Sequence, residues 1–443
     1  MIVLKNGKQK ESRLLNKEIL KLAIPNILSN LSVPMLSAVD TALMGHLSPV
    51  YLGAIGLGSM IFNFIYWNFG FLRMGTTGMV SQAYGAQDHE KTYDLLTAAV
   101  RLSLIIALVI VLLSPYLFEI LNRLLYVKDV HQSAIATYTS IRIYDAPATI
   151  MLYALTGWFF GRQNAFIPLA VIITINTMNM VISYILVHSY GIGIAGVAWG
   201  TVVSQYAGVV IMMVFLVTRY DYSIASLVKS RTAIDLVQFF AINRDLFIRT
   251  VLLTLAFVML YRYSNQLGPI ELAANVVILQ FLNWISFGID GFAYAAESIV
   301  GKYKGQNNQK GLLDAVRLCI YWGAAVALVY TVIFLFGTSK IVNLYTQDIA
   351  IISHINMLKP WVLALPMIGF VCYIFDGIFI GLLESQFMRD SMIISFGIFV
   401  ASVSILPFNN AVLWSCFCLF LLLRGLAQVY YWNRIIKAKL LRS

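Results

Sequence analysis

The sequence predicts an all-α polytopic membrane protein with twelve transmembrane helices in two six-helix bundles related by pseudo-twofold symmetry. Three observations predict this class: an apolar composition, recurrent long apolar segments and an internal repeat. Hydrophobic residues make up 60% of the chain and charged residues 12%, whereas soluble domains carry about 25% charge. The mean hydropathy is +0.80. This composition excludes an ordinary water-soluble domain.

Twelve apolar segments are each long enough to cross a hydrocarbon core of roughly 30 Å. Backbone groups in lipid must be hydrogen-bonded within their own segment, which favours helices. The segments also lack the alternation at every second residue that is typical of membrane barrel strands. The expected spans are residues 18–44, 51–80, 92–114, 131–160, 166–188, 193–217, 236–263, 270–299, 311–337, 350–381, 389–406 and 409–432.

Residues 46–90 align without a gap on residues 266–310, and the same offset superimposes GWFFG (157–161) on GIFIG (377–381). We therefore expect two half-molecules joined by a polar segment. The expected parts are an N-terminal lobe (1–217), a cytoplasmic linker (218–235) and a C-terminal lobe (236–443). Each half has an even number of spans, so both enter the membrane in the same direction. Duplicated halves of this kind are typical of transporters.

Lys and Arg predict the orientation, because cytoplasmic loops are enriched in them. With the N-terminus inside, the expected inner segments hold twenty Lys and Arg residues and the outer segments hold four. The first 21 residues are polar and basic, and we interpret them as a cytoplasmic tail rather than a cleaved signal peptide. The net charge of +11 is then explained by topology and by contact with anionic lipid, and nucleic-acid binding is not expected.

Asp40 is the strongest candidate for a functional side chain. It lies deep in the first expected span, after Pro25 and Pro34. An ionised residue at the centre of a membrane helix costs about 2.5–3.5 kcal/mol, which makes it a functional candidate. Because burial disfavours the charged form, Asp40 is suited to take up a proton on one side and release it on the other. The structural alternative is a protonated, hydrogen-bonded core residue.

Polar side chains in the fifth expected span form a second set of candidates. Asn176 and Asn179 lie one turn apart and Ser183 follows four residues later, so the three share a helix face. This strip could meet Asp40. The alternative is hydrogen bonding between helices without a role in transport.

Tyr138 and Asp145 in the fourth expected span are further candidates, together with Arg142 between them. A simple ion pair between Arg142 and Asp145 is the structural alternative.

The second half contains two acids, Asp290 and Asp376, that could line the substrate path or form a second ion site. The first-half residues at the 220 offset are Gly70 and Thr156, so the two lobes are expected to differ in chemistry. Arg424 is expected to reach the membrane surface or to make a structural pair.

Five long stretches carry a resemblance to a known family. They are VPMLSAVDTALMGHLSPVYLGAIGLG around Asp40, FLRMGTTGMVSQAYGA at 71–86, NRDLFIRT at 243–250, IDGFAYAAESIVG at 289–301 and FDGIFIGLLESQFMRDSM at 375–392. With these stretches the chain resembles the multidrug and toxic compound extrusion (MATE) transporters and, within them, the DinF branch. The resemblance runs essentially from end to end.

The resemblance implies two six-helix lobes around a V-shaped central cleft and export driven by an inward H⁺ or Na⁺ gradient. It also implies that Asp40 is the proton-coupling residue and that the family's helix 5 Asn is Asn179. Many relatives have an Asp four residues after that Asn, where this chain has Ser183. The departure removes one carboxylate, which argues against Na⁺ coordination and against a relay between two carboxylates.

The sequence thus predicts a secondary active antiporter that exports small organic, cationic or amphiphilic substrates by alternating access. H⁺ is the expected coupling ion and Na⁺ the other candidate, with protonation of Asp40 driving release. No cofactor or metal is expected. We expect a monomer in a bacterial cytoplasmic (inner) membrane, with both termini cytoplasmic.

Two other classes of protein are less consistent with the residues. A flippase for a lipid-linked saccharide or another amphiphile would share the architecture, but its cavity is usually lined by Lys or Arg, and the mid-span ionisable residues here are mainly acidic. An enzyme is disfavoured because the spans contain no HExxH, GxSxG or paired-Asp protease pattern. Nothing resembles the filter loop of a channel.

Overall fold

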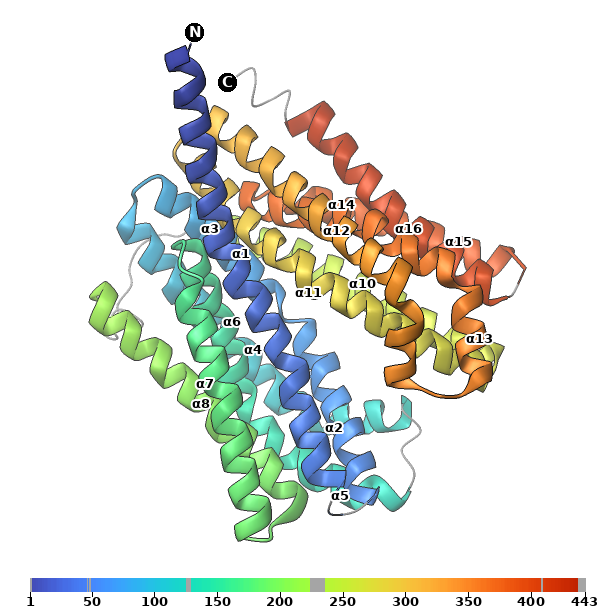
Figure 1. Ribbon diagram of the computed structural model, residues 1–443. Coiled ribbons are helices and arrows are strands. Elements are labelled where there is room, and N and C mark those ends of the chain that lie inside the picture. The colour runs from blue at the N-terminus through green and yellow to red at the C-terminus, as the bar shows by residue number, and fades with distance from the viewer. Residues whose placement is uncertain are drawn as a thin grey trace. The chain divides into compact units, whose positions relative to one another are not determined.

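The computed structural model describes residues 2–45, 47, 49–124, 129–223, 236–407 and 409–436. These residues are almost entirely helical, and none of them lies in a strand (Figure 1). The elements of the first half are α1 (Ile2–Gly45), α2 (Pro49–Trp67), α3 (Phe71–Gly85), α4 (His89–Leu124), α5 (Asp129–Arg142), the 3₁₀ turn η1 (Ile143–Asp145), α6 (Ala146–Gly161), α7 (Phe166–Tyr184), the π-helical turn η2 (Ile185–Ser189) and α8 (Gly193–Tyr220).

The second half repeats the same kind of succession. Its elements are α10 (Leu236–Leu267), α11 (Pro269–Gly305), α12 (Gln309–Tyr345), α13 (Ile349–Met357), α14 (Lys359–Leu382), α15 (Ser385–Ile405), α16 (Asn410–Tyr431) and the π-helical turn η3 (Trp432–Ile436). The all-α fold class is thereby confirmed.

The chain divides into two compact units, which we call the N-terminal unit (Leu28–Tyr84 and Asp88–Leu236) and the C-terminal unit (Met1–Ile27, Gly85–Gln87 and Val237–Ser443). They differ from the expected lobes (1–217 and 236–443) chiefly at residues 1–27, which belong to the C-terminal unit. In that unit, the first part of α1 forms ion pairs with α11 and α12. Most of the expected linker, residues 218–235, lies outside the described residues.

Within the described residues, ten helical segments are long and apolar enough to cross a membrane. The fourth expected span (131–160) is not among them, because η1 divides it into α5 of 14 residues and α6 of 16 residues. The first expected span lies within α1. The number twelve therefore stays a prediction that this arrangement fits.

The 220-residue repeat predicted from the sequence recurs in the positions of the helices. The starts of α2 and α11, of α4 and α12, and of α5 and α13 are each 220 residues apart. One difference between the copies is that α2 and α3 are separated at residues 68–70, where Gly70 N donates to Trp67 O at 3.1 Å, whereas α11 continues through the equivalent residues.

The repeated GxxxG motifs seat equivalent helices against each other. In the N-terminal unit, a Cβ atom on Gly157 of α6 would lie 2.5 Å from the backbone oxygen of Arg73 in α3. In the C-terminal unit, a Cβ atom on Gly377 of α14 would overlap the backbone oxygen of Ala293 in α11. Arg73 and Ala293 are again 220 residues apart. The absence of a side chain at these glycines lets the helix backbones touch, as small residues do in membrane bundles.

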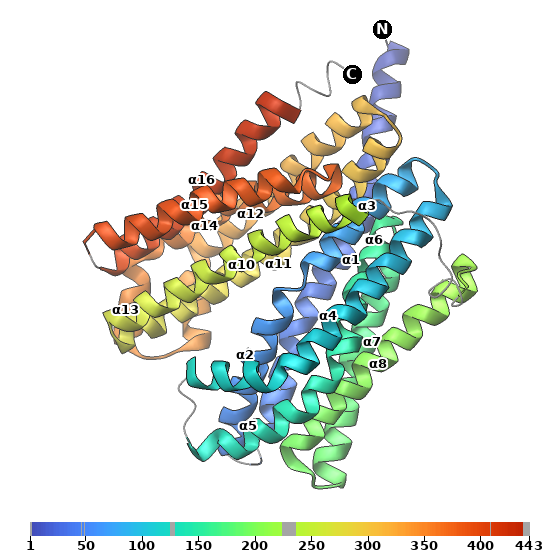
Figure 2. The same cartoon turned by 180° about the vertical axis from the view of Figure 1, so that it is seen from behind.

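Each unit has its own core. In the N-terminal unit, α4 packs on α6, α2 on α5, and α7 on α8, as seen from behind in Figure 2. In the C-terminal unit, α11, α12 and α14 pack together, and α16 joins α14 to α15. Trp158 and Trp414 are fully buried at these packed centres, and both indole N–H groups are hydrogen-bonded, to Thr92 O at 2.8 Å and to Asn275 Oδ1 at 2.7 Å.

Candidate functional site

Asp40 lies in the part of α1 that belongs to the N-terminal unit. Its side chain is half-buried, and its Oδ1 atom is buried with no hydrogen-bond partner among the described residues. The charged group that acts on it is the guanidinium of Arg142, which attracts it electrostatically. A carboxylate with an unpaired oxygen in such surroundings gains from binding a proton or a cation.

Arg142, at the end of α5, is held in place by aromatic and acidic side chains. It forms an ion pair with Asp145, its Nε donates to the Tyr138 hydroxyl at 3.3 Å, and its guanidinium lies 5.1 Å from the centre of the Phe62 ring. The Tyr66 hydroxyl donates a further hydrogen bond to Asp145. The structural alternative of an Arg142–Asp145 pair is therefore confirmed.

The same cluster surrounds the two site candidates Tyr138 and Asp145. Asp145 is fully buried and compensated on both carboxylate oxygens. Tyr138 is 2% exposed, and its close approach to α2 depends on Gly58, where any Cβ would press on the tyrosine ring. Arg142 thus acts on two carboxylates at once, by direct pairing with Asp145 and through space on Asp40.

The polar side chains on α7 form hydrogen bonds to two different helices, α1 and α8. Asn176 donates to the Ser32 hydroxyl of α1 at 2.9 Å. Asn179 donates to the Thr201 hydroxyl of α8 at 2.8 Å, and Ser183 donates to Asn179 Oδ1 at 3.4 Å. Ser32 precedes Asp40 by eight residues, about 12 Å along a helix, so this hydrogen bond reaches α1 two turns before the acid.

Ser183 occupies a place with little room. It is fully buried, and the backbone of Gly200 in α8 lies so close that a Cβ there would overlap the Ser183 hydroxyl. A hydroxyl fits this contact, whereas an aspartate carboxylate would bring additional volume and a charge into it. The departure from the family pattern at this position is consistent with the packing of α7 against α8.

Asp376 in the C-terminal unit is surrounded by basic groups. Arg249 of α10 and Arg424 of α16 both form ion pairs with Asp376 Oδ2, and Gln428 donates to Oδ1 at 2.7 Å. The four residues are between 0% and 6% exposed. Asp376, which was expected to line a substrate path or an ion site, is therefore neutralised by two arginines of the protein. The expected structural pair of Arg424 is confirmed.

Asp290 lies on α11, half-buried. It interacts electrostatically with Tyr373 of α14, whose hydroxyl accepts a hydrogen bond from Ser286 at 3.3 Å. Asp290 and Asp376 thus lie on adjacent helices of the same unit, while Asp40, Tyr138, Asp145 and the α7 strip lie in the other.

Sequence reasoning missed Arg249 and Gln428 as partners of Asp376. A signal for Arg249 was present, because an arginine in an apolar span is costly and generally has an acidic partner. Nothing local indicated which acid it would meet. Among the described residues, no group of three or more His, Cys, Asp or Glu side chains is arranged to hold a metal ion.

Comparisons with known proteins agree with this architecture. The MatE family model matches twice, at residues 25–185 and 246–406, one match in each half of the repeat. DNA damage-inducible protein F of Escherichia coli (strain K12) is 32% identical over 95% of this chain and 92% of its own. Probable multidrug resistance protein NorM of Thermotoga maritima is 23% identical over 76% of this chain and 74% of its own.

A solved structure described as MATE in the bent conformation superimposes with a TM-score of 0.86, at 18% identity, over 98% of both chains. Its likeness supports the fold of two six-helix bundles. The family model covers most of the chain and the relative from Escherichia coli extends over nearly all of it. The chain therefore belongs to the MatE family of secondary transporters, and it is a multi-pass membrane protein rather than an enzyme.

Proposed function

We propose that this protein is a proton-coupled antiporter that exports small organic, cationic or amphiphilic compounds, with Asp40 as its coupling carboxylate. One observation carries the proposal: Asp40 has a buried carboxylate oxygen without a partner among the described residues, whereas Asp145 and Asp376 are each paired with arginine. An acid that is already neutralised by a fixed guanidinium has little to gain from a proton.

The substrate class is supported by the names of the relatives, which describe multidrug resistance and extrusion. They favour drug export over the flippase alternative. A carboxylate that alternates between charged and neutral forms can hold an organic cation in one state and release it in the other.

The transport cycle that we propose alternates the charge of Asp40. When Asp40 is ionised, it attracts both the cargo and the guanidinium of Arg142. A proton arriving from outside the cell removes that charge, so the cargo loses its counter-charge and Arg142 is left with Asp145 as its partner. The proton leaves Asp40 on the cytoplasmic side, which completes an exchange of one proton for one cation.

Ser183 supports H⁺ rather than Na⁺ as the coupling ion. Na⁺, a hard cation, is expected to need several oxygen ligands, preferably from carboxylates and carbonyls, as Ca²⁺ does. Ser183 offers an uncharged hydroxyl, which donates its hydrogen bond to Asn179, and the second carboxylate of many relatives is missing. We also propose that the protein is a monomer in the inner membrane of a bacterium. The distribution of Lys and Arg predicts that both of its termini are cytoplasmic.

The test uses the full chain in liposomes with ethidium, a planar organic cation, as the transported probe. An imposed pH gradient is expected to drive ethidium transport by the parent protein in the absence of Na⁺, and Asp40→Asn is expected to abolish it. Asp314→Asn is the matched control, since it removes a half-exposed carboxylate whose ion pair with Arg317 is long, at 4.0 Å. Normal transport by Asp40→Asn would remove Asp40 from coupling, and transport driven by Na⁺ alone would overturn the choice of ion.

A further inference from the structure

The described acidic side chains in the first part of α1 pair with other helices of the C-terminal unit. Glu18 forms an ion pair with Lys302 at 2.9 Å, and Glu11 with Lys310 at 2.8 Å. Asn16 accepts a hydrogen bond from the indole of Trp322 at 2.8 Å. These contacts all run to α11 and α12, so the acids of this segment are used within the C-terminal unit.

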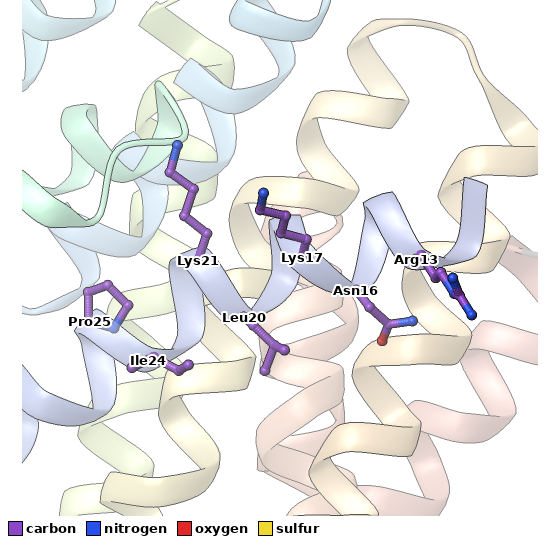
Figure 3. A pocket seen from close by; sticks show the side chains of 7 residues that line it. All are labelled: Arg13, Asn16, Lys17, Leu20, Lys21, Ile24 and Pro25. Atoms are coloured by element: carbon purple, nitrogen blue, oxygen red, sulfur yellow. The ribbon is translucent and has the colours of Figure 1, made fainter. Parts of the chain in front are cut away.

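Three basic side chains of the same segment make no such contact with a described residue. Arg13, Lys17 and Lys21 are exposed, and none of the carboxylates in the described chain lies within ion-pair distance of them. Their spacing of four residues places them along one side of the helix, and Figure 3 shows Lys17 and Lys21 extending in the same direction. The surface therefore carries a concentrated positive charge.

Apolar side chains continue this basic row towards the membrane span. A surface pocket of about 580 Å³ is lined by Leu20, Ile24 and Pro25 together with Asn16 and the three basic residues (Figure 3). Ile24 is 50% exposed. The pocket is thus basic at the end nearer the N-terminus and apolar at the end that enters the expected first span.

We propose that this pocket binds an anionic phospholipid, with Arg13, Lys17 and Lys21 around the phosphate and an acyl chain against Leu20 and Ile24. Basic clusters next to a membrane helix are attracted to anionic lipid headgroups, and an adjoining apolar surface adds the burial of hydrocarbon. The polar and apolar ends follow each other along the helix in the order that a lipid in the cytoplasmic leaflet requires. That placement uses the orientation predicted from Lys and Arg and does not depend on the coupling role of Asp40.

A soluble anion would contact only the basic half of this pocket. Inorganic phosphate can meet the three basic groups, but it leaves Ile24 and Leu20 in contact with water. The apolar half therefore favours a lipid and makes the two sources of phosphate distinguishable by experiment.

The test measures lipid retention by native mass spectrometry, with the full chain purified from vesicles of phosphatidylcholine containing phosphatidylglycerol. We expect the parent chain to retain phosphatidylglycerol in preference to phosphatidylcholine. Each basic residue near an anionic surface contributes about a five-fold change in affinity, so Arg13→Gln/Lys17→Gln/Lys21→Gln is expected to lower retention on the order of 100-fold. A smaller loss is expected for Ile24→Asn, which changes no charge.

The matched control, Arg317→Gln/Lys340→Gln/Arg434→Gln, removes the same charge from exposed positions elsewhere in the C-terminal unit. It is expected to retain phosphatidylglycerol like the parent chain. Equal retention by the triple variant of α1, or an equal loss in the control, would overturn the proposal. Full displacement of the lipid by millimolar inorganic phosphate would show that the site takes soluble anions, and would overturn it as well.

Discussion

Asp40 and Asp376 are both acids within apolar helices, yet their surroundings are opposite. Two buried guanidinium groups contact Asp376, so its negative charge balances the protein's own cations. Asp40 has one carboxylate oxygen without a described partner, and Arg142 attracts it through space. The same residue type is therefore expected to stabilise the fold in one unit and to bind a transported charge in the other.

Asp376→Asn is expected to destabilise the protein strongly, because it leaves Arg249 and Arg424 buried without a counter-charge. Breaking a buried ion pair from one side typically costs about 3–5 kcal/mol. Asp390→Asn is the control, since its pair with Arg389 is 40% exposed on the acid side and such pairs contribute about 0–1 kcal/mol. Thermal unfolding in detergent measures both. Loss of proton coupling in a well-folded Asp376→Asn protein would instead give this acid a role in transport.

Ser183→Asp tests the reason for the departure at this position. The carboxylate would crowd the backbone of Gly200, so we expect a loss of about 1–3 kcal/mol in the free energy of unfolding, and no stabilisation by Na⁺. Ser183→Ala should change stability far less, since it gives up only the long 3.4 Å hydrogen bond to Asn179. The midpoint of thermal unfolding, with and without Na⁺, is the measurement. A midpoint for Ser183→Asp that rises with Na⁺ would contradict the packing argument.

At the scale of elements, the contacts of α6 with α3 and of α14 with α11 use the same packing of a glycine against a helix backbone. The glycines at 157 and 377 remove the side chain where two helix backbones meet. Such close contacts add dispersion attraction between helices, which is what holds bundles together where lipid weakens the hydrophobic effect. The motif GWFFG and its counterpart GIFIG were visible in the sequence, but their partner helices were not.

Gly377→Ala is expected to lower stability by about 1–3 kcal/mol, because the added methyl group collides with rigid backbone in α11. Gly397→Ala is the matched control. It also lies in a helix, but nothing lies within 4 Å of the position of its Cβ, so alanine there should be neutral or stabilising by up to about 1 kcal/mol. Thermal unfolding of the two variants compares them directly. Equal midpoints would mean that α14 can shift away from α11 without cost.

The break between α5 and α6 was not expected from the sequence. Hydropathy alone made residues 131–160 one span, although Arg142 and Asp145 lie in the middle of it. The structure places a 3₁₀ turn at residues 143–145. There Arg142 and Asp145 form an ion pair, Tyr66 donates to Asp145, and Tyr138 accepts a hydrogen bond from Arg142. A short-range ion pair of this kind was foreseeable from the spacing of three residues, but the aromatic partners were not.

For the whole molecule, the repeat predicts the positions of the helices better than the positions of the acidic residues. Three pairs of helix starts follow the 220-residue offset, and the MatE family model matches each half once. The acids do not follow the offset, because Asp290 and Asp376 stand opposite Gly70 and Thr156. The first 27 residues also leave the half to which they belong in sequence and pack with the C-terminal unit.

The sequence by itself determined the membrane class, the positions of most helices, the duplication and the family. These properties follow from local features, since hydropathy and motif identity are carried by neighbouring residues. Only the tertiary structure decided which buried acids are neutralised. Arg249 and Arg424 reach Asp376 from 127 and 48 residues away in the chain, and Arg142 acts on Asp40 from a different helix. The charge that each buried acid has left to bind a proton depends on these long-range pairings, because a carboxylate held by a fixed arginine is already neutralised.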